Sequence, residues 1–474
     1  MKPNILFFLI DSFRADACYS EKKTSISPNL DSLVNNGVYF SQNICSAAVT
    51  VPSISSILTS LYPFEAIILD ENHFKLNPQK TTYIKKLIEF GYNAYTIIPE
   101  LESKLGLNQV FKDNIETYPS SSTLYDGLGE KIVSKLESNS LKEPWIYYLN
   151  FLDLHGSATF QLSKGPKEFQ DKKYGVNQYE RMVSAMDVWI GKILDKINLE
   201  NTLIVLTADH GSEVGVYTSE IESYRKKIIK YKPSLAYKIT HKITTNFPEF
   251  LQPLRKKLSK TYTNRKKNII EKRKNIEFEK IENKYLQSYQ KRIIQHSVKP
   301  VMNVYDDRLR VPLIFTGYGI NNKKIITHQV RSIDIFPTIA EIIGLHDQKN
   351  LGRGHSLFPI IQGQKFEELP VLVDSITNSP KSTTSDVVGI RTSQYKYFRD
   401  RINPQKSIQL FDLTKDALEE NNIASLQPDV VDYMEKKLLE IKEDGIFRIE
   451  DKKEVTNESE NLKIEEELKK LGYI

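Results

Sequence analysis

The sequence predicts an α/β protein with a doubly wound, mainly parallel sheet, a small C-terminal antiparallel sheet and a helical insert. Continuous apolar runs at residues 5–10, 145–151 and 202–207 are typical of strands that are covered on both faces. Amphipathic segments at residues 81–90 and 179–197 alternate with these runs. Strands that alternate with helices favour a parallel sheet with helices packed on both of its faces.

Shorter segments continue this alternation. Residues 28–36 and 53–60 have apolar side chains at helical spacing, and Pro52 stands where a helix would begin. Gly91 ends the helix predicted at residues 81–90, and strands are predicted at residues 93–98 and 312–316. The alternation therefore extends over most of the first 377 residues.

Two regions depart from this pattern. The segment 217–295 is rich in lysine, with Tyr, Ile and Leu at helical intervals, and we expect it to form a basic helical insert. Residues 220–292 alone contain 21 Lys or Arg and 7 Glu, a net charge of +14, against +6 for the whole chain. Short strand patterns at 387–392, 395–398 and 408–413 precede a helical pattern at 430–441. We therefore expect a larger domain over residues 1–377, which contains the insert, and a small α+β subdomain over residues 378–474.

The composition indicates a globular protein without a membrane span. No run of about 18 apolar residues is present. The apolar start of the chain is too short for a signal peptide, and Asp11 and Arg14 follow it directly. Two cysteines, Cys18 and Cys45, make no disulfide framework in a chain of 474 residues. We expect a cytoplasmic location, with peripheral contact at a membrane through the basic insert as an option.

Polar side chains stand where two predicted strands end. Asp11 follows the first strand, and Asp209 and His210 follow the strand at residues 202–207. In open α/β sheets, ligands bind at the carboxyl ends of the strands. Two carboxylates and an imidazole at that edge suit a divalent cation, and Mn²⁺, Zn²⁺, Mg²⁺ and Ca²⁺ all stay open. A lone Asp at a strand end more often caps a helix.

Several motifs recur in a characteristic order. They are PNIL at 3–6, DSFRAD at 11–16, SPNLDSL at 27–33, GVYF at 37–40, LTADHG at 206–211, RVPLI at 310–314, SIDIFPTI at 332–339 and LFDL at 410–413. In this order and spacing the chain resembles the sulfatase family of the alkaline phosphatase superfamily. The resemblance covers most of the chain except roughly residues 217–295, and it implies an alkaline phosphatase/sulfatase-like catalytic domain.

The resemblance places a nucleophile in a Cys/Ser-x-Pro-x-Arg motif. The matching stretch here is TVPSI at residues 50–54. In family members the Cys or Ser becomes formylglycine, but Thr50 is neither residue and Ile54 replaces the arginine, so we expect no formylglycine. Ser12 stands where many members have a second metal-binding Asp. Residues 97–102 contain no match to the cationic residues that sulfatases usually carry there.

The departure at Thr50 points to the threonine-nucleophile branch of the superfamily, which includes phosphodiesterases and phosphotransferases. That branch implies a divalent ion held by Asp11, Thr50, Asp209 and His210, and attack by the activated Thr50 hydroxyl on a phosphoester. The amino end of the following helix would favour an anionic group. The alternative for Thr50 is a threonine that only caps this helix.

Two further histidines receive roles from the resemblance. His155 follows the strand at 145–151, where family members have a histidine near the leaving group, and an imidazole can protonate a departing alkoxide near neutral pH. The alternative is a hydrogen-bonded loop histidine. His296 precedes the RVPLI motif, and we expect it to contact substrate.

Three functions follow, in order of preference. The first is a metal-dependent hydrolase or transferase that acts on phosphoester-type groups through Thr50. The second is a sulfuric ester hydrolase, and the third is a non-catalytic anion- or membrane-binding protein on a sulfatase scaffold. The expected substrate is an anionic ester, glycan-linked or lipid-linked. The insert is either a solvated helical hairpin or a lid for an anionic polymer or lipid surface, and no nucleic-acid-binding module is visible.

Overall fold

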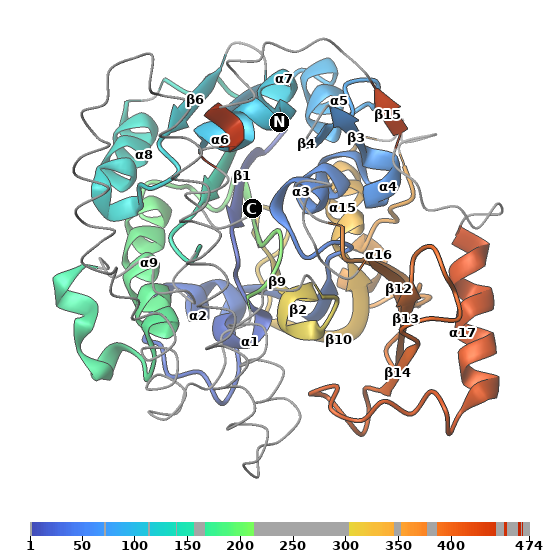
Figure 1. The fold of residues 1–474 in the computed structure, drawn as a ribbon. Coiled ribbons are helices and arrows are strands. Elements are labelled where there is room, and N and C mark those ends of the chain that lie inside the picture. The colour runs from blue at the N-terminus through green and yellow to red at the C-terminus, as the bar shows by residue number, and fades with distance from the viewer. Residues whose placement is uncertain are drawn as a thin grey trace, which may run out of the picture. The chain divides into compact units, whose positions relative to one another are not determined.

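The computed structural model describes residues 2–70, 73–111, 114–138, 140–155, 166–212, 303–345, 352–376, 386–441, 450–452, 463–465 and 467 (Figure 1). The insert expected at residues 217–295 and the candidate His296 lie outside these residues. Among the described helices, none combines the length and the apolar character needed to cross a bilayer.

An eight-stranded sheet forms the centre of the described structure, in the order β10-β2-β9-β8-β1-β7-β5-β6 (Figure 1). Only β9 runs against its neighbours, β8 and β2, and every other adjacent pair is parallel. The prediction of a mainly parallel sheet is therefore confirmed. The strands are β1 (Asn4–Ile10), β2 (Gly37–Ile44), β5 (Asn93–Pro99), β6 (Ile115–Tyr118), β7 (Trp145–Phe151), β8 (Thr202–Thr207), β9 (Arg310–Gly317) and β10 (Lys324–Arg331).

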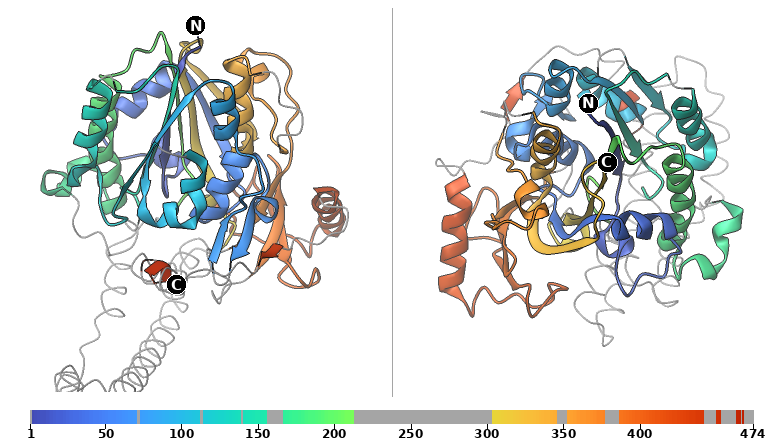
Figure 2. Two further views of the ribbon diagram at one scale, coloured as in Figure 1. Left: turned by 90° about the horizontal axis from the view of Figure 1, so that it is seen from above. Right: turned by 180° about the vertical axis from the view of Figure 1, so that it is seen from behind.

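Helices cover both faces of this sheet, as the left view of Figure 2 shows, which confirms the doubly wound arrangement. One face carries α3 (Thr50–Thr59), α5 (Tyr83–Glu89), α15 (Ile335–Ile342) and α16 (Phe358–Ile361); the other carries α1 (Ala15–Cys18), α2 (Pro28–Asn35), α8 (Leu128–Glu137) and α9 (Gln178–Leu194). On the first face, Phe7 stacks between Tyr148 and Phe336, with ring centroids 5.2 and 5.3 Å apart. All seven residues of β1 are buried, as its continuous apolar run predicts.

The register of three parallel strands brings the candidate site residues to one edge. In β1, Leu9 pairs with Thr207 of β8, and Ile10 pairs with Phe151 of β7. The carboxyl ends of these strands therefore coincide, and Asp11 and Asp209 each lie just beyond such an end. The Asp11 amide donates to the Phe151 carbonyl at 2.9 Å, which fixes the start of the turn.

The C-terminal antiparallel sheet is also confirmed, with the order β11-β12-β13-β14. Its strands are β11 (Val371–Asp374), β12 (Val387–Arg391), β13 (Tyr395–Asp400) and β14 (Gln409–Asp412), and α17 (Pro428–Ile441) packs on it. β11 precedes residue 378, and the domain boundary that we expected there stays a prediction. The hydrogen-bonded pairing of β11 with β12 places β11 in this small sheet. A short apolar run in the sequence does not show which strand it will pair with.

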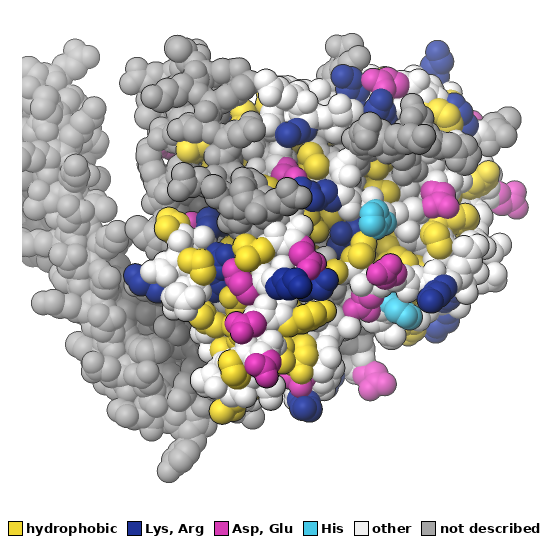
Figure 3. Space-filling view, turned by 90° about the vertical axis from the view of Figure 1, so that its right-hand side faces the viewer, with side chains coloured by type: hydrophobic (Ala, Val, Ile, Leu, Met, Phe, Trp, Pro, Cys, Tyr) yellow, Lys and Arg dark blue, Asp and Glu magenta, His cyan; other side chains and the backbone are white. Residues whose placement is uncertain are grey.

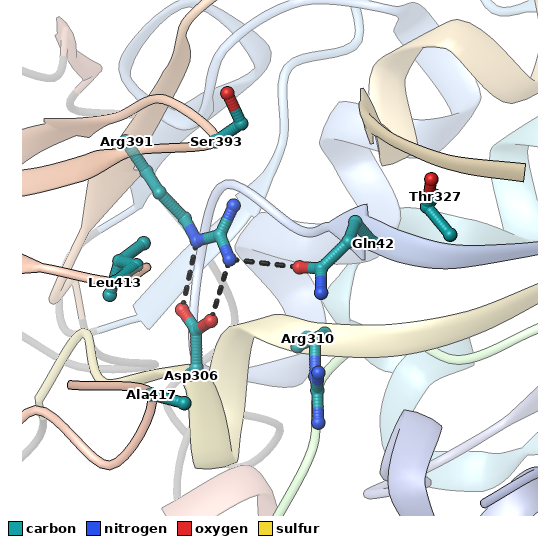
Figure 4. Close-up of a pocket in the computed structure, with 8 residues that line it drawn as sticks. All are labelled: Gln42, Asp306, Arg310, Thr327, Arg391, Ser393, Leu413 and Ala417. Carbon is teal, nitrogen blue, oxygen red and sulfur yellow. Dashed lines mark hydrogen bonds and ion pairs between the residues drawn. The ribbon is translucent and has the colours of Figure 1, made fainter. Parts of the chain in front are cut away.

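A buried ion-pair network lies where this small sheet meets the chain before β9. Arg391 of β12 donates to both carboxylate oxygens of Asp306 at 3.0 and 2.8 Å, and to Gln42 of β2 at 2.9 Å (Figure 4). Asp306 begins the single-turn helix α14 (Asp306–Leu309), which leads into β9. On the neighbouring outer face, acidic and basic side chains are interspersed rather than separated by sign (Figure 3).

Several elements differ from the expectations. β2 and β10 were not expected, because Ser41, Gln42 and Asn43 interrupt the apolar pattern of β2 at a register shift in its pairing. A third sheet, β15 (Glu450–Lys452), β3 (Ile67–Asp70) and β4 (His73–Leu76), was not expected either. Helix α3 begins at Thr50 rather than Ser53, and Pro52 lies in its first turn, where its missing amide hydrogen costs no helical bond.

Candidate active site and metal centre

Asp11, Asp209 and His210 form a compact buried cluster at the carboxyl edge of the large sheet. One potential ligand atom from each lies within 4.8 Å of the other two. Both carboxylates are fully buried, and His210 is nearly so. The sequence therefore identified three groups that the fold brings together.

The turn after β1 holds the two carboxylates in place. Ser12 adopts a left-handed backbone conformation with φ of 61°, which costs a residue other than glycine about 1 kcal/mol. Its amide donates to Asp209 Oδ1 at 3.1 Å, and its hydroxyl donates to Asp11 Oδ1 at 2.6 Å. The hydroxyl of Tyr179 in α9 donates to the Ser12 carbonyl at 2.8 Å. Ser12 therefore orients both acids, although it cannot supply a carboxylate itself.

His210 presents an unprotonated nitrogen to the cluster. Its Nδ1 lies 2.8 Å from the Gly211 carbonyl, so Nδ1 carries the hydrogen and Nε2 keeps its lone pair. Burial lowers the pKa of His210 to about 4, and the charge of Arg308 acts in the same direction. Nε2 lies 3.4 Å from both Asp209 Oδ2 and the Thr50 hydroxyl oxygen.

The donor set fits a divalent cation. Asp209 Oδ2 has no hydrogen-bond donor among the described residues, and it faces the Nε2 lone pair of His210. Both of these atoms carry lone pairs, and no hydrogen lies between them. A cation bound by Asp209 Oδ2 and His210 Nε2 would therefore relieve their repulsion. Burial and the charge of Asp11 raise the pKa of Asp209 well above its ordinary value. Burial also opposes ionisation of Asp11, but the charge and hydrogen bond of His155 outweigh it and hold the pKa of Asp11 below its ordinary value.

Thr50 is the first residue of α3 and points its hydroxyl into this cluster. The hydroxyl donates to Asp11 Oδ2 at 3.1 Å, and its burial is nearly complete. The residue that caps α3 is Val49, so the alternative role of Thr50 as the capping residue is wrong. One turn further, the Ser53 hydroxyl donates to the Asp209 carbonyl, which joins the helix to the end of β8.

His155 contacts the carboxylate oxygen of Asp11 that Thr50 does not contact. Its Nδ1 lies 2.9 Å from Asp11 Oδ1, and its side chain is 15% exposed. If Nδ1–H donates to this carboxylate, Nε2 is the ring nitrogen that could exchange a proton with a substrate. The loop before His155 is held by Asp153, whose carboxylate accepts from the Leu124 amide at 3.1 Å.

Other side chains near the centre were not predicted. Arg308 in α14 donates to the carbonyl of Ala48 at 3.1 Å, two residues before Thr50, and its charge acts on His210. Glu102 and Asn150 form a buried pair beside Asp11 and Asp209. A polar residue inside the apolar run of β7 was the available signal for Asn150.

Cys45 lies five residues before Thr50 and is fully buried. Burial raises the pKa of its thiol far above the ordinary value. Its Sγ donates to the Ala47 carbonyl at 3.2 Å. The buried thiol is therefore not activated as a nucleophile.

The arrangement of sheet, helices and C-terminal subdomain matches the sulfatase fold. A solved structure of a 2-O glycosaminoglycan sulfatase, BT1596, superposes with a TM-score of 0.62 at 16% identity, covering 94% of this chain and 93% of that chain. The structure of BT4656 in complex with its substrate D-glucosamine-2-N,6-O-disulfate superposes with a TM-score of 0.59 at 15% identity, covering 94% and 99%. At these identities the likeness concerns the fold.

The chain belongs to the sulfatase family, because the family model matches residues 3–345. A second model, of the N-sulphoglucosamine sulphohydrolase C-terminal region, matches residues 297–444. The bovine protein arylsulfatase K (Bos taurus) is 33% identical over 146 residues, 30% of this chain. This match spans only 27% of the bovine protein. These relatives do not support the threonine-nucleophile phosphodiesterase branch that we expected.

Proposed function

We propose that this protein is a metal-dependent sulfuric ester hydrolase in which Thr50 is the nucleophile. The observation that carries the proposal is the position of the Thr50 hydroxyl, 3.1 Å from Asp11 Oδ2 and 3.4 Å from His210 Nε2. Membership of the sulfatase family supports the sulfate ester, which was our second expectation, over the phosphoester that we had placed first.

The reaction has two balanced steps. Thr50 Oγ1 attacks the sulfur of R–O–SO₃⁻ and passes its proton to Asp11, the S–O bond to the leaving group breaks, and the alcohol R–OH leaves with a proton from His155 Nε2. Water then attacks the sulfur of the sulfothreonine, the S–O bond to Thr50 breaks and hydrogen sulfate is released. Asp11 returns its proton to Thr50 Oγ1, which restores the hydroxyl and the carboxylate. His155, now deprotonated, accepts the proton of that water. The hydroxyl serves directly, so this route requires no formylglycine.

Positive groups surround the place where the sulfate would lie. A divalent ion held by Asp11, Asp209 and His210 would lower the pKa of the Thr50 hydroxyl and stabilise negative charge on the ester oxygens. The amino end of α3, a helix of 10 residues, adds the positive end of its dipole. Arg308 adds a guanidinium close to the same helix end. These groups would orient an anionic ester for attack.

The substrate class that we propose is a sulfated sugar. The neighbour BT4656 was solved with D-glucosamine-2-N,6-O-disulfate, and BT1596 is a 2-O glycosaminoglycan sulfatase. The C-terminal match to N-sulphoglucosamine sulphohydrolase points to the same chemistry. Contact of the basic insert with a membrane stays a separate prediction.

Phosphoester transfer is the second candidate, and Thr50 itself favours it. An unmodified threonine forms a phosphothreonine as readily in principle as a sulfothreonine, and a buried carboxylate beside it suits either attack. The two candidates differ in the ester that turns over and in the group left on Thr50.

A substrate panel separates these candidates. Metal-free protein is reconstituted with Mn²⁺, Zn²⁺, Mg²⁺ or Ca²⁺ and given chromogenic sulfate, phosphate monoester, phosphate diester and phosphonate substrates. We expect turnover of the sulfate ester, and covalent radiolabel on wild-type protein but not on T50A when the sulfur of the ester is labelled. Turnover and labelling with phosphoesters alone would replace the proposal by the second candidate. Turnover by a T50A variant would remove Thr50 from the mechanism.

A further inference from the structure

A second buried polar cluster lies beside the Asp11–Asp209–His210 cluster. Glu102 is in α6 (Glu100–Glu102), the turn of helix that directly follows β5, and Asn150 is near the end of β7. Because β5 and β7 are parallel neighbours, both side chains reach the edge at which Asp11 lies. Asn150 Nδ2 donates to Glu102 Oε2, so the two polar groups meet. Only 3% of Glu102 and none of Asn150 is exposed.

Three oxygens in this cluster have no hydrogen-bond partner within the described part of the chain. They are Glu102 Oε1, Asn150 Oδ1 and the hydroxyl of Tyr148. Buried side-chain oxygens in native proteins are nearly always paired, and an unpaired one costs about 1–3 kcal/mol. Because Asn150 Nδ2 is already committed to Glu102, the amide oxygen faces no donor and is available to a further ligand.

Negative charge accumulates at this place. Burial raises the pKa of both Glu102 and Asp209, and the charge of Asp11 on Glu102 and of Glu102 on Asp209 acts in the same direction. One divalent ion at Asp11, Asp209 and His210 compensates two of the three carboxylates. A third ionised carboxylate would remain buried without compensation, which is costly unless a cation or a proton pairs with it.

We propose that Glu102 and Asn150 bind a second cation, a hard divalent ion of the Mg²⁺, Ca²⁺ or Mn²⁺ class. A carboxylate oxygen and an amide oxygen are ligands that these ions prefer, and the Tyr148 hydroxyl is close enough for the charge of Glu102 to act on it. The second ion satisfies the unpaired oxygens and compensates the charge of Glu102. It also places a fixed positive charge behind Asp11, where it would tune the carboxylate that accepts from Thr50.

The count of bound ions tests this proposal without any substrate. Metal-free protein is dialysed to equilibrium against Mn²⁺, and bound manganese per chain is measured by elemental mass spectrometry. We expect two ions for wild type and one for E102Q, or a second ion bound at least about 10-fold more weakly. The matched control is E100Q on the same helical turn, where we expect two ions as in wild type. The count does not depend on which ester the protein hydrolyses.

Each other result overturns the proposal. One ion in both wild type and E102Q would mean that an ordered water or a proton satisfies Glu102. Two ions in both would place the second ion elsewhere. If E102Q does not fold, N150A keeps the carboxylate and removes the amide oxygen. We then expect the second ion to bind at least about 10-fold more weakly, and unchanged binding in N150A would overturn the proposal.

Discussion

The hydroxyl oxygen of Thr50 lies 3.1 Å from Oδ2 of Asp11, although 39 positions separate the two residues in the sequence. Asp11 ends the first strand of the sheet, and Thr50 begins the helix that packs over the same edge. The hydroxyl is thus held between a carboxylate and the unprotonated nitrogen of His210. Such surroundings favour removal of its proton, and this is the basis of the first prediction.

Replacement of Thr50 by alanine should lower kcat by at least about 10³-fold, because it deletes the attacking oxygen. T50S keeps the hydroxyl and should retain activity within about 10-fold of wild type. The measurement is steady-state turnover of an aryl sulfate with saturating Mn²⁺. T59A, at the far end of the same helix, is the control and should keep wild-type turnover. Comparable kcat values for T50A and T59A would contradict the role of Thr50.

His155 should matter most when the leaving group is poor. An alkyl sulfate releases a basic alkoxide that needs a proton, so H155A should lower its kcat by about 10²–10⁴-fold. Nitrophenolate leaves without a proton, and the loss with nitrophenyl sulfate should stay below about 10-fold. The exposed His328 in β10 offers the control variant H328A. Equal losses with both leaving groups would assign His155 to positioning Asp11 instead.

The substitution D209N should have opposite effects on the stability of the protein without and with bound metal. Without metal, burial and the charge of Asp11 raise the pKa of Asp209, so an ionised Asp209 destabilises the fold at neutral pH. Metal-free D209N should therefore be at least as stable as metal-free wild type. At about 100 times the Kd of this centre, Mn²⁺ bound there should stabilise wild type by about 2.7 kcal/mol, and this part of the Mn²⁺ stabilisation should be lost in D209N.

Thermal unfolding with and without Mn²⁺ measures these effects. The exposed Asp432 in α17 provides the control D432N, which should respond to Mn²⁺ like wild type. A D209N variant that keeps the full increase in Tm would place the ion at other residues.

The sequence was sufficient to predict the cluster of candidate metal ligands, because these residues lie at the ends of strands. Apolar runs mark where β1 and β8 stop, and parallel strands bring their carboxyl ends together. The sequence alone therefore predicts that Asp11, Asp209 and His210 lie together. The candidacy of Thr50 as nucleophile followed from the order of the family motifs, since nothing in the local pattern around Thr50 identifies it.

Contacts between side chains that depend on the order of the strands could not be predicted from the sequence. Glu102 meets Asn150 only because β5 lies next to β7, although 48 positions separate the two residues. Arg308 reaches the start of α3 because a single turn of helix precedes β9, which runs against its neighbours. Periodicity gives neither strand order nor direction, so the sequence could not show which side chains these residues would meet.

The buried network under the C-terminal sheet should be a main source of stability. Lys396 is fully buried and contacts Asp306 Oδ1 at 2.5 Å and Glu419 Oε1 at 2.7 Å. K396M would remove the cation that contacts Glu419 and one of the two cations that contact Asp306, so we expect a loss of about 3–5 kcal/mol in the free energy of unfolding. Lys415 is 82% exposed in its ion pair with Asp412 and offers K415M as control, with a loss below about 1 kcal/mol. Denaturant unfolding measures both, and equal losses would contradict the prediction.

Asp153 should make the stability of the protein depend on pH. It is fully buried below the His155 loop, and burial raises its pKa to about 7. A folded-state pKa above the unfolded value means that the contribution to stability is complete in acid. That contribution declines above about pH 4, and its loss is complete once the pH exceeds about 7. Between pH 5 and 8 this single group should cost wild type about 2–3 kcal/mol.

D153N removes the titrating group but keeps an oxygen that can accept from the Leu124 amide. The free energy of unfolding of D153N should therefore fall less between pH 5 and 8 than that of wild type, and the difference between the two proteins isolates Asp153 from every other titrating group. Urea unfolding at half-unit pH intervals provides the measurement. D429N, at an exposed position in the first turn of α17, should follow the wild-type curve. Parallel curves for wild type and D153N would show that Asp153 does not change its protonation on unfolding, and the buried carboxylate would then have to be ionised throughout this range.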